Sequence, residues 1–324
     1  MKTPLAGLKV LDLSRVLAGP WATQLLGDYG ADVVKVERPG SGDDTRSWGP
    51  PWLGSEAAYF LAANRNKRSV TVDLSTPDGC AVVRALARQA DVVIENFRVG
   101  TMQRFGLAPE DLMRVNTGLI VCSISAFGQT GSRAHEPGYD AMIQASGGLM
   151  SITGPPDEEG GGPQKVGVAI ADIMAGMYAV SAILAALHVR HATGRGQHID
   201  VPLYDSQVAW LANQAMNFLV GHEVPVRLGT AHPNLVPYQA FASSDGNLML
   251  AVGNDPQFRR CMECIGCAEL GADERFATND ARIANRAELV AIIADRLKRK
   301  PTAHWLGEFG HHGIPSGPIN DIGQ

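Results

Sequence analysis

Short apolar runs alternate with amphipathic stretches and polar turns through the first part of the chain. The runs are rich in valine, isoleucine and leucine and are bounded by glycine, proline or aspartate, which predicts buried strands. Strand, helix and strand at this spacing form the βαβ units of a parallel sheet. Predicted strands span residues 8–13, 31–37, 69–74, 91–95, 119–124 and 198–201, and predicted helices between them span residues 21–29, 77–89, 109–115 and 141–149. We therefore expect an α/β fold with a Rossmann-like parallel sheet.

The pattern changes after Gly221. Two strand-like runs flank the turn at residues 244–247, which predicts a hairpin of residues 238–243 and 248–252. Helical patterns follow at residues 256–265, 286–299 and 302–309. We expect a large α/β domain over residues 1–200, a linker helix over 201–226 and a small α+β domain over 227–324.

One apolar stretch, residues 166–187, contains a single charged residue, Asp172. The stretch is long enough to span a bilayer, but a central Asp costs about 2.5–3.5 kcal/mol there. A helix that is apolar on every side is more simply the buried helix of a soluble domain. Composition alone favours Asp172 as a helix N-cap over a catalytic role. Both roles are compatible, because a carboxylate at a helix N-terminus stays ionised and can act as a nucleophile.

Net charge and cysteine content indicate which ligands and which cellular compartment to expect. The formal net charge of −5 argues against a general nucleic-acid binder, so a polyphosphate ligand would need a local cluster of Arg and Lys. The beginning of the chain shows no apolar signal region. The five cysteines follow no disulfide pattern, which is typical of a reducing cytoplasm.

Four motifs suggest ligands only weakly. The turn at residues 14–20 lacks the glycine fingerprint of NAD-binding proteins, although Glu37 ends the second strand where a ribose-binding acid would lie. The basic run 64–68 is either a solvated turn or a phosphate contact. Cys261, Cys264 and Cys267 fit a helix better than a cluster site. The pair His311-His312 lacks a carboxylate or cysteine companion at metal spacing, so we expect no metal.

Polar residues after the strands predict where a ligand would bind. Ligands of open α/β sheets lie at the carboxyl ends of the strands, and residues 96–104 follow the fourth strand there. Asp140 is most simply the N-cap of the helix that begins at residue 141, and residues 155–163 form an acidic surface loop. Residues 203–220 are expected to form one further helix.

Several motifs together resemble the class III coenzyme A transferases. They are Ala18-Gly19-Pro20, Gly27-Asp28-Tyr29-Gly30-Ala31-Asp32-Val33, Lys35-Val36-Glu37-Arg38-Pro39-Gly40, Asn66-Lys67-Arg68-Ser69, Glu95-Asn96-Phe97, Gly128-Gln129-Thr130-Gly131, Gly138-Tyr139-Asp140, Thr193-Gly194-Arg195-Gly196 and Gly317-Pro318-Ile319-Asn320. The runs at residues 42–51 and 229–241 are most similar to the dicarboxylate branch, which includes succinate–hydroxymethylglutarate CoA-transferase. The motifs are spread over the whole chain.

The resemblance implies a site. Asp172 matches the family nucleophile, which reverses the preference for a mere N-cap. The positions that match family contacts to CoA are Arg38, Val72, Asp73, Leu74, Ser75, Asn96, Phe97, Arg98, Arg104, Pro137, Gly138 and Tyr139. Arg46, Gly229 and His232 are expected to meet the acid substrate, and the 229–230 and 147–148 regions to supply N–H donors for an oxyanion.

Some positions depart from family patterns. Tyr139 stands where the racemase branch has a histidine, which argues against racemisation. Pro137 stands where some transferases have a lysine. Leu17 replaces the glutamine of formyl-CoA transferase, and the glycine run of that enzyme near Gly229 is absent, so formate and oxalate are not expected as substrates.

The resemblance implies that CoA moves between an acyl-CoA, succinyl-CoA first, and a free dicarboxylic acid through an aspartyl anhydride and thioester. No cofactor is expected to stay bound, since CoA is a substrate, and neither nucleic acid nor a membrane is an expected partner. Family members continue beyond the position of Gln324, so we expect an interlocked cytoplasmic homodimer where that C-terminal segment is present. Two alternatives stay open: an acyl-CoA racemase or isomerase, and a truncated CoA-binding protein without turnover.

Overall fold

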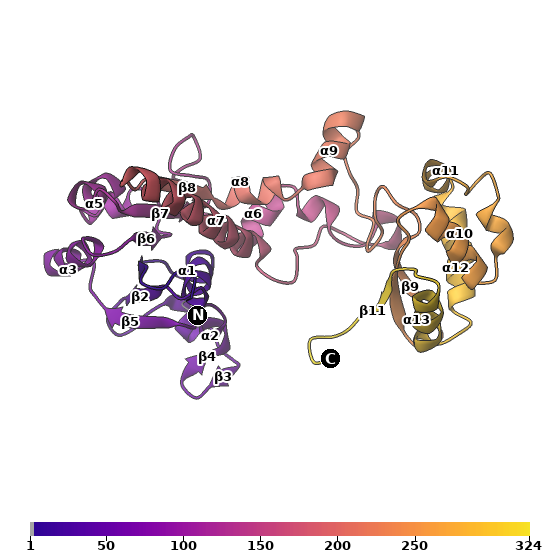
Figure 1. Cartoon of the computed structure of the whole chain (residues 1–324), viewed down its shortest axis with the longest axis horizontal. Coiled ribbons are helices and arrows are strands. Elements are labelled where there is room, and N and C mark those ends of the chain that lie inside the picture. The colour runs from indigo at the N-terminus through magenta and orange to yellow at the C-terminus, as the bar shows by residue number, and fades with distance from the viewer. Residues whose placement is uncertain (1–2) are drawn as a thin grey trace. The chain divides into compact units, whose positions relative to one another are not determined.

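The computed structural model describes residues 3–324, which form two compact units (Figure 1). The first unit joins the chain up to Ser151 with Lys165–Gly221, and the second joins Ile152–Gln164 with His222–Gln324. The acidic loop at residues 155–163 thus belongs to the second unit, where Asp157 pairs with Arg227. The domain bounds expected at residues 200 and 226 stay a prediction.

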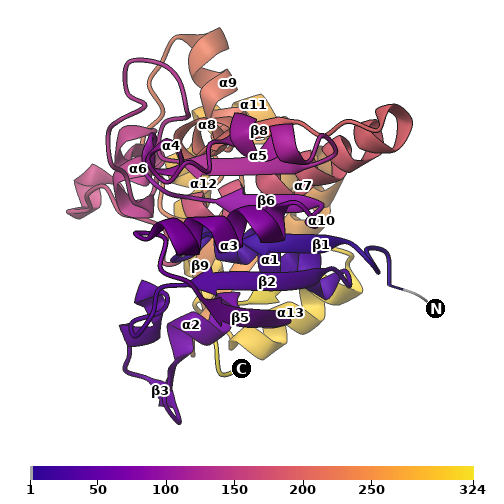
Figure 2. The same ribbon diagram turned by 90° about the vertical axis from the view of Figure 1, so that its left-hand side faces the viewer.

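The first unit contains a six-stranded parallel sheet in the order β5-β2-β1-β6-β7-β8 (Figure 2). Its strands are β1 (Lys9–Asp12), β2 (Asp32–Glu37), β5 (Lys67–Thr71), β6 (Val92–Glu95), β7 (Ile120–Ser125) and β8 (His198–Pro202), and a separate hairpin pairs β3 (Trp52–Leu53) with β4 (Glu56–Ala57). Its helices are α1 (Ala18–Asp28), α2 (Ala58–Ala63), α3 (Pro77–Ala87), α4 (Thr101–Arg104), α5 (Pro109–Val115), α6 (Asp140–Ser146), α7 (Ile170–Thr193), α8 (Leu203–Ala209) and α9 (Ala212–Gly221). The expected α/β fold is confirmed.

Successive residues of each central strand face opposite sides of the sheet, as the pleat requires. In β6, Val92 and Ile94 pack in the core with α1 and α7, whereas Val93 packs in the core with α3 and α5. Both faces of the sheet are therefore covered by helices (Figure 2). This two-sided burial explains why the strands read as continuous apolar runs in the sequence.

Helix α7 is a core helix on one face only. Its buried residues recur at helical spacing, including Ala175, Ala179 and Ile183. Among the described residues it is the one helix that is long and apolar enough to cross a membrane, but it packs against α1, α8 and two strands. Leu184 and Val189, in contrast, are 39% and 46% exposed, so the expectation of burial on every side is wrong.

The expected single helix at residues 203–220 is also wrong. It is divided into α8 and α9, with Trp210 as the C-cap of α8. Ala212 has φ of 42°, in the left-handed region that a continuous right-handed helix does not contain.

The second unit is α+β, as predicted. Its antiparallel sheet has the order β11-β10-β9, with β9 (Tyr238–Ala242), β10 (Asn247–Ala251) and β11 (Ser316–Pro318). The predicted hairpin is confirmed as β9 and β10. Helices α10 (Asp255–Cys264), α11 (Asn279–Ala284), α12 (Arg286–Leu297) and α13 (Thr302–His311) pack on it around a core that includes Phe258, Cys261 and Phe309.

Two buried ion pairs lie near the start of α1: one joins β5 to the end of β1, and the other joins β2 to the loop that follows it. Lys67 Nζ lies 3.1 Å from Asp12 Oδ2, and Lys35 Nζ lies 2.9 Å from Asp43 Oδ2, with at most 2% of each of these side chains exposed. Burial opposes ionisation, but Lys67 and Lys35 hold the pKa of Asp12 well below its usual range. Lys67 is therefore not a free phosphate contact, whereas Arg65 and Asn66 of the same basic run form an exposed turn, as the solvated-turn reading expects.

Lys67→Ala should destabilise the first unit by about 3–5 kcal/mol, because it leaves the buried Asp12 carboxylate without its partner. Arg68→Ala is the matched control, since Arg68 pairs with Asp32 at the surface and its loss should cost at most about 1 kcal/mol. Urea unfolding followed by circular dichroism measures both. Equal costs for the two variants would contradict the structural role of Lys67.

Candidate functional site

The strand order creates a crevice at one edge of the large sheet. The chain runs outward from β1 to β2 and β5, and then returns to β6 on the other side of β1. The loops that follow β1 and β6 therefore diverge at the carboxyl ends of neighbouring strands, where open α/β sheets bind ligands. Arg15 and Asn96 join these loops: Arg15 N donates to Asn96 Oδ1 at 2.8 Å, and Asn96 Nδ2 donates to Arg15 O at 2.7 Å.

Two adjoining clefts occupy this edge of the first unit. Asp172 lines the first cleft, of about 940 Å³, together with the predicted residues Asn96, Phe97, Arg98, Pro137, Gly138 and Tyr139. The second cleft, of about 1030 Å³, is lined by the predicted residues Arg38, Val72, Asp73, Leu74, Ser75, Phe97, Arg98 and Arg104. Arg15, Phe97 and Arg98 line both clefts, so the two form one continuous surface. The structure thus brings together every residue predicted to contact CoA.

The second cleft carries the cations that an acidic protein needs for a polyphosphate. Arg38 pairs with Asp44, and Arg104 donates to Thr101 Oγ1 at 3.0 Å. Arg98 is exposed at the border of both clefts. These side chains lie on separate loops and on α4, and only the sheet topology makes them neighbours.

Arg15 is a site residue that sequence reasoning missed. Its Nη1 lies 3.4 Å from Asp44 Oδ2, and its guanidinium carbon lies 5.5 Å from the centre of the Phe97 ring. Its Nε is buried without a hydrogen-bond partner among the described residues. The signal in the sequence was the position of Arg15 in the turn after the first strand, where open α/β sheets bind ligands.

Asp172 is the third residue of α7 rather than its N-cap, since the N-cap position belongs to Ala169. The helix start is capped from another element: Asp140 Oδ1 accepts the N–H of Ala171 at 2.8 Å. Asp140 itself is the first residue of α6, so its expected role as N-cap of that helix is wrong. Gln144 extends the tether, because it donates to Asp140 Oδ2 at 2.7 Å and accepts the N–H of Val166 at 2.9 Å.

The electrostatic environment of Asp172 opposes its ionisation. Burial and the negative charge of Asp140 raise the pKa of Asp172 from 3.8 to about 7. The position of Asp172 in the first turn of α7 favours the ionised carboxylate, whereas burial and Asp140 oppose it. A pKa near 7 together with a position in a cleft makes Asp172 a candidate functional group.

Tyr59 on α2 is a second residue that the sequence did not indicate. Burial and the negative charges of Asp172 and Asp140 raise the pKa of its phenol. The Tyr59 ring packs edge-on against Trp48, with ring centres 5.0 Å apart. Trp48 belongs to the loop at residues 39–54, so this loop packs against Tyr59.

Arg46 does not offer a free guanidinium to a substrate. Its Nε and Nη2 bind Glu37 at 2.7 and 2.8 Å, and its Nη1 binds Glu56 at 2.8 Å. Its guanidinium carbon also lies 3.8 Å from the centre of the Phe60 ring. This geometry argues against Arg46 as a residue that binds the substrate carboxylate. It also gives Glu37, which lies where a ribose-binding acid would lie in an NAD-binding protein, a structural role.

Gly229 and His232 belong to the second unit. The Gly229 N–H donates to Gly154 O at 3.0 Å, and the Gly147 N–H donates to Ile143 O at 2.8 Å, so neither N–H is left for an oxyanion. His232 Nδ1 accepts the N–H of Asn234 at 3.0 Å. Burial and the positive charge of Arg286 lower the pKa of His232. Its contact with substrate stays a prediction.

Comparisons with known proteins identify the family of the chain. The family model described as "CoA-transferase family III" matches residues 5–324. The chain is 52% identical to the succinate–glutarate CoA-transferase of Agrobacterium fabrum, over 99% of this chain and 81% of that protein, and 46% identical to human succinyl-CoA:glutarate CoA-transferase, over 98% and 72%. A crystal structure of a CAIB/BAIF family protein from Brucella suis is 52% identical and superposes with a TM-score of 0.87, covering 100% of this chain and 85% of that chain.

Asp140→Asn should lower the pKa of Asp172 below about 7, because it removes a negative charge and keeps an oxygen that can cap Ala171. Carbon-13 NMR of labelled aspartate carboxyl groups measures the titration, with Asp172→Asn identifying the signal. Asp205→Asn, an exposed carboxylate on α8, is the control and should leave the pKa of Asp172 unchanged. An unchanged or higher pKa in Asp140→Asn would show that Asp140 does not act on Asp172.

Proposed function

Because this chain belongs to CoA-transferase family III and is therefore a CoA-transferase, we propose that it moves CoA from succinyl-CoA to a free dicarboxylic acid through covalent intermediates on Asp172. Relatives named for succinyl-CoA and glutarate, citramalate or mesaconate support this choice of donor and acceptor. The observation that carries the proposal is the raised pKa of Asp172 within a cleft that continues into a basic one.

CoA binding is assigned to the second cleft. Arg38, Arg98 and Arg104 supply positive charge at its border, and residues 72–75 supply main-chain and hydroxyl groups after β5. Hydrogen bonds to charged groups contribute about 1.5–3 kcal/mol each, so two or three such contacts to phosphates account for specific binding. The thioester end would then extend past Phe97 and Arg98 into the first cleft, where Asp172 lies.

The reaction consists of four exchanges at carbonyl carbons. The Asp172 carboxylate attacks the succinyl thioester carbon and the C–S bond breaks. CoA departs as the thiolate, and a mixed anhydride of Asp172 and succinate remains. The thiolate attacks the Asp172 carbonyl carbon, which releases succinate and gives an aspartyl-CoA thioester. The acceptor carboxylate attacks that carbon and expels the thiolate, forming a second anhydride. The thiolate finally attacks the acceptor carbonyl, which gives the new acyl-CoA and restores Asp172.

The environment that raises the pKa of Asp172 also favours these acyl intermediates. Anhydride and thioester are neutral at Asp172, whereas the free carboxylate places a second negative charge beside Asp140. A rise from 3.8 to about 7 corresponds to about 4 kcal/mol against the carboxylate. Acylation removes that charge in the same way as protonation, so part of this free energy lowers the cost of forming the intermediates.

The distal carboxylate of the acceptor needs a cation or donor, since a buried unpaired charge is costly. Arg46 is engaged by Glu37 and Glu56, so we assign this role to Arg15 or Arg98, which line the first cleft. Arg15 has a buried Nε without a partner among the described residues. His232 stays a candidate donor for the same group.

Assembly and compartment follow as further proposals. On α9, Met216, Leu219 and Val220 are 54%, 62% and 73% exposed, and α7 presents an exposed apolar face as well. Apolar faces of this kind favour association, so we propose a homodimer that covers them.

All five cysteines are free thiols, which supports a cytoplasmic location.

With succinyl-CoA as donor, the chain should transfer CoA to glutarate, and butyrate should be a poor acceptor because it lacks the second carboxylate. Asp172→Ala should reduce transfer by about three or more powers of ten while CoA binding, measured by calorimetry, stays nearly unchanged. Chromatography of the acyl-CoA products measures the exchange. Equal rates with butyrate would contradict a second carboxylate site, and wild-type rates in Asp172→Ala would remove the nucleophile assignment.

A further inference from the structure

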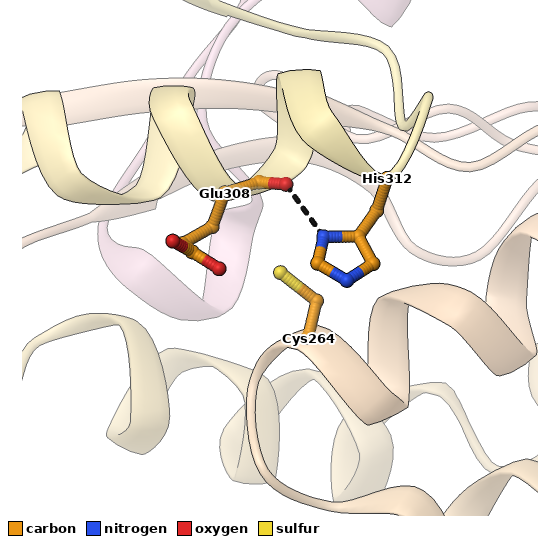
Figure 3. Close-up of side chains that lie close together, drawn as sticks. All are labelled: Cys264, Glu308 and His312. Atoms are coloured by element: carbon orange, nitrogen blue, oxygen red, sulfur yellow. Dashed lines mark hydrogen bonds between the residues drawn. The ribbon is translucent and has the colours of Figure 1, made fainter.

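Three side chains with metal-binding atoms meet in the second unit. Cys264 is the last residue of α10, Glu308 lies on α13, and His312 follows that helix directly. One ligand atom from each of the three lies within 4.8 Å of the others. Figure 3 shows the Cys264 thiol between the Glu308 carboxylate and the His312 ring. The expectation that the histidine pair has no carboxylate or cysteine companion is therefore wrong.

The helices that carry these side chains are fixed by a shared core. Cys261 on α10 and Trp305 and Phe309 on α13 are buried in the same apolar cluster. Glu308 and His312 are one helical turn apart, so their side chains lie on the same face. The three groups are thus presented by packed helix ends rather than by a free loop, which is the arrangement that precise ion binding requires.

The hydrogen bonding of His312 favours a role as a metal ligand. Its Nδ1 lies 2.8 Å from the main-chain oxygen of Glu308, which accepts only if Nδ1 carries the proton (Figure 3). That tautomer leaves the lone pair of Nε2 available, and a carbonyl partner of this kind orients most metal-bound histidines. Arg260 Nε donates to His312 O at 3.1 Å and so fixes the main chain at this residue.

We propose that Cys264, Glu308 and His312 bind one zinc(II) ion. A thiolate, an imidazole and a carboxylate form a donor set that zinc accepts, and the two anionic ligands balance its charge. Ligand atoms of tetrahedral zinc lie about 3.5 Å apart, so the three groups need only small side-chain movements. Glu308 is half-buried and His312 is exposed, which leaves room for that movement and for a water as the fourth ligand.

The ion would join the end of α10 to the end of α13. Because the site belongs to the folded second unit, zinc should stabilise that unit against unfolding by mass action. This role is independent of CoA transfer, and its test does not depend on enzyme activity.

Cobalt(II) and zinc(II) titrations of the reduced, tag-free full chain test the proposal. We expect one ion per chain, with a thiolate-to-cobalt charge-transfer band that zinc abolishes by competition. Cys264→Ser should remove the band, and Glu308→Gln or His312→Ala should each weaken zinc binding at least about tenfold by calorimetry. His311→Ala and Glu263→Gln are the matched controls, since both residues are exposed neighbours of the ligands, and neither should change affinity.

Three results would overturn the proposal: no stoichiometric ion, a charge-transfer band that persists in Cys264→Ser, or an affinity that is unchanged in the Glu308 and His312 variants. Thermal unfolding with and without zinc gives a second readout. The wild-type chain and both controls should gain stability with zinc, whereas His312→Ala, an exposed change that leaves the core intact, should gain less. Equal gains in wild type and His312→Ala would also contradict it.

Discussion

The carboxylate of Asp140 has two effects at the start of α7, and the chemistry proposed for the first unit depends on both. It accepts the N–H of Ala171 at 2.8 Å and thereby fixes the first turn in which Asp172 lies. It also repels the charge of Asp172 and, with burial, raises the pKa of that group to about 7. One neighbouring side chain thus fixes the position of the proposed nucleophile and adds to the effect of burial on its pKa. A neutral cap such as serine would hold the helix but would add no charge repulsion to the effect of burial on Asp172.

Buried charges fix the remaining parts of the site in a similar way. Lys35 binds Asp43 at 2.9 Å and so holds the loop after β2, in which Asp44 pairs with Arg38 and Arg15. Arg46 joins the same loop to Glu37 at the end of that strand. The sheet order supplies the other constraint, because it places the loops after β1 and β6 next to each other. The two clefts result from this topology together with a small set of ion pairs.

Apolar runs predicted the six parallel strands, because a strand buried on both faces of a sheet is apolar throughout. Strand-like patterns beside a turn predicted the hairpin of β9 and β10 in the second unit. The split at Ala212 was missed, since a left-handed alanine carries no such pattern. Family resemblance gathered Asp172 and the CoA positions into one site, but it assigned Arg46 to the substrate. Its partners Glu37 and Glu56 are nine and ten residues distant, and only the fold shows that they use its donors. The fold alone likewise shows that Lys67 pairs with Asp12 and that Cys264 lies next to His312.

The central claim is that Asp172 becomes acylated during transfer, and trapping with hydroxylamine tests it most directly. The chain is incubated with succinyl-CoA, treated with hydroxylamine and digested, and the peptides are analysed by mass spectrometry. An activated aspartyl carbonyl at residue 172 should yield a hydroxamate there, dependent on succinyl-CoA and absent from Asp172→Asn. A hydroxamate at another carboxylate, or none under conditions in which transfer proceeds, would contradict the covalent mechanism.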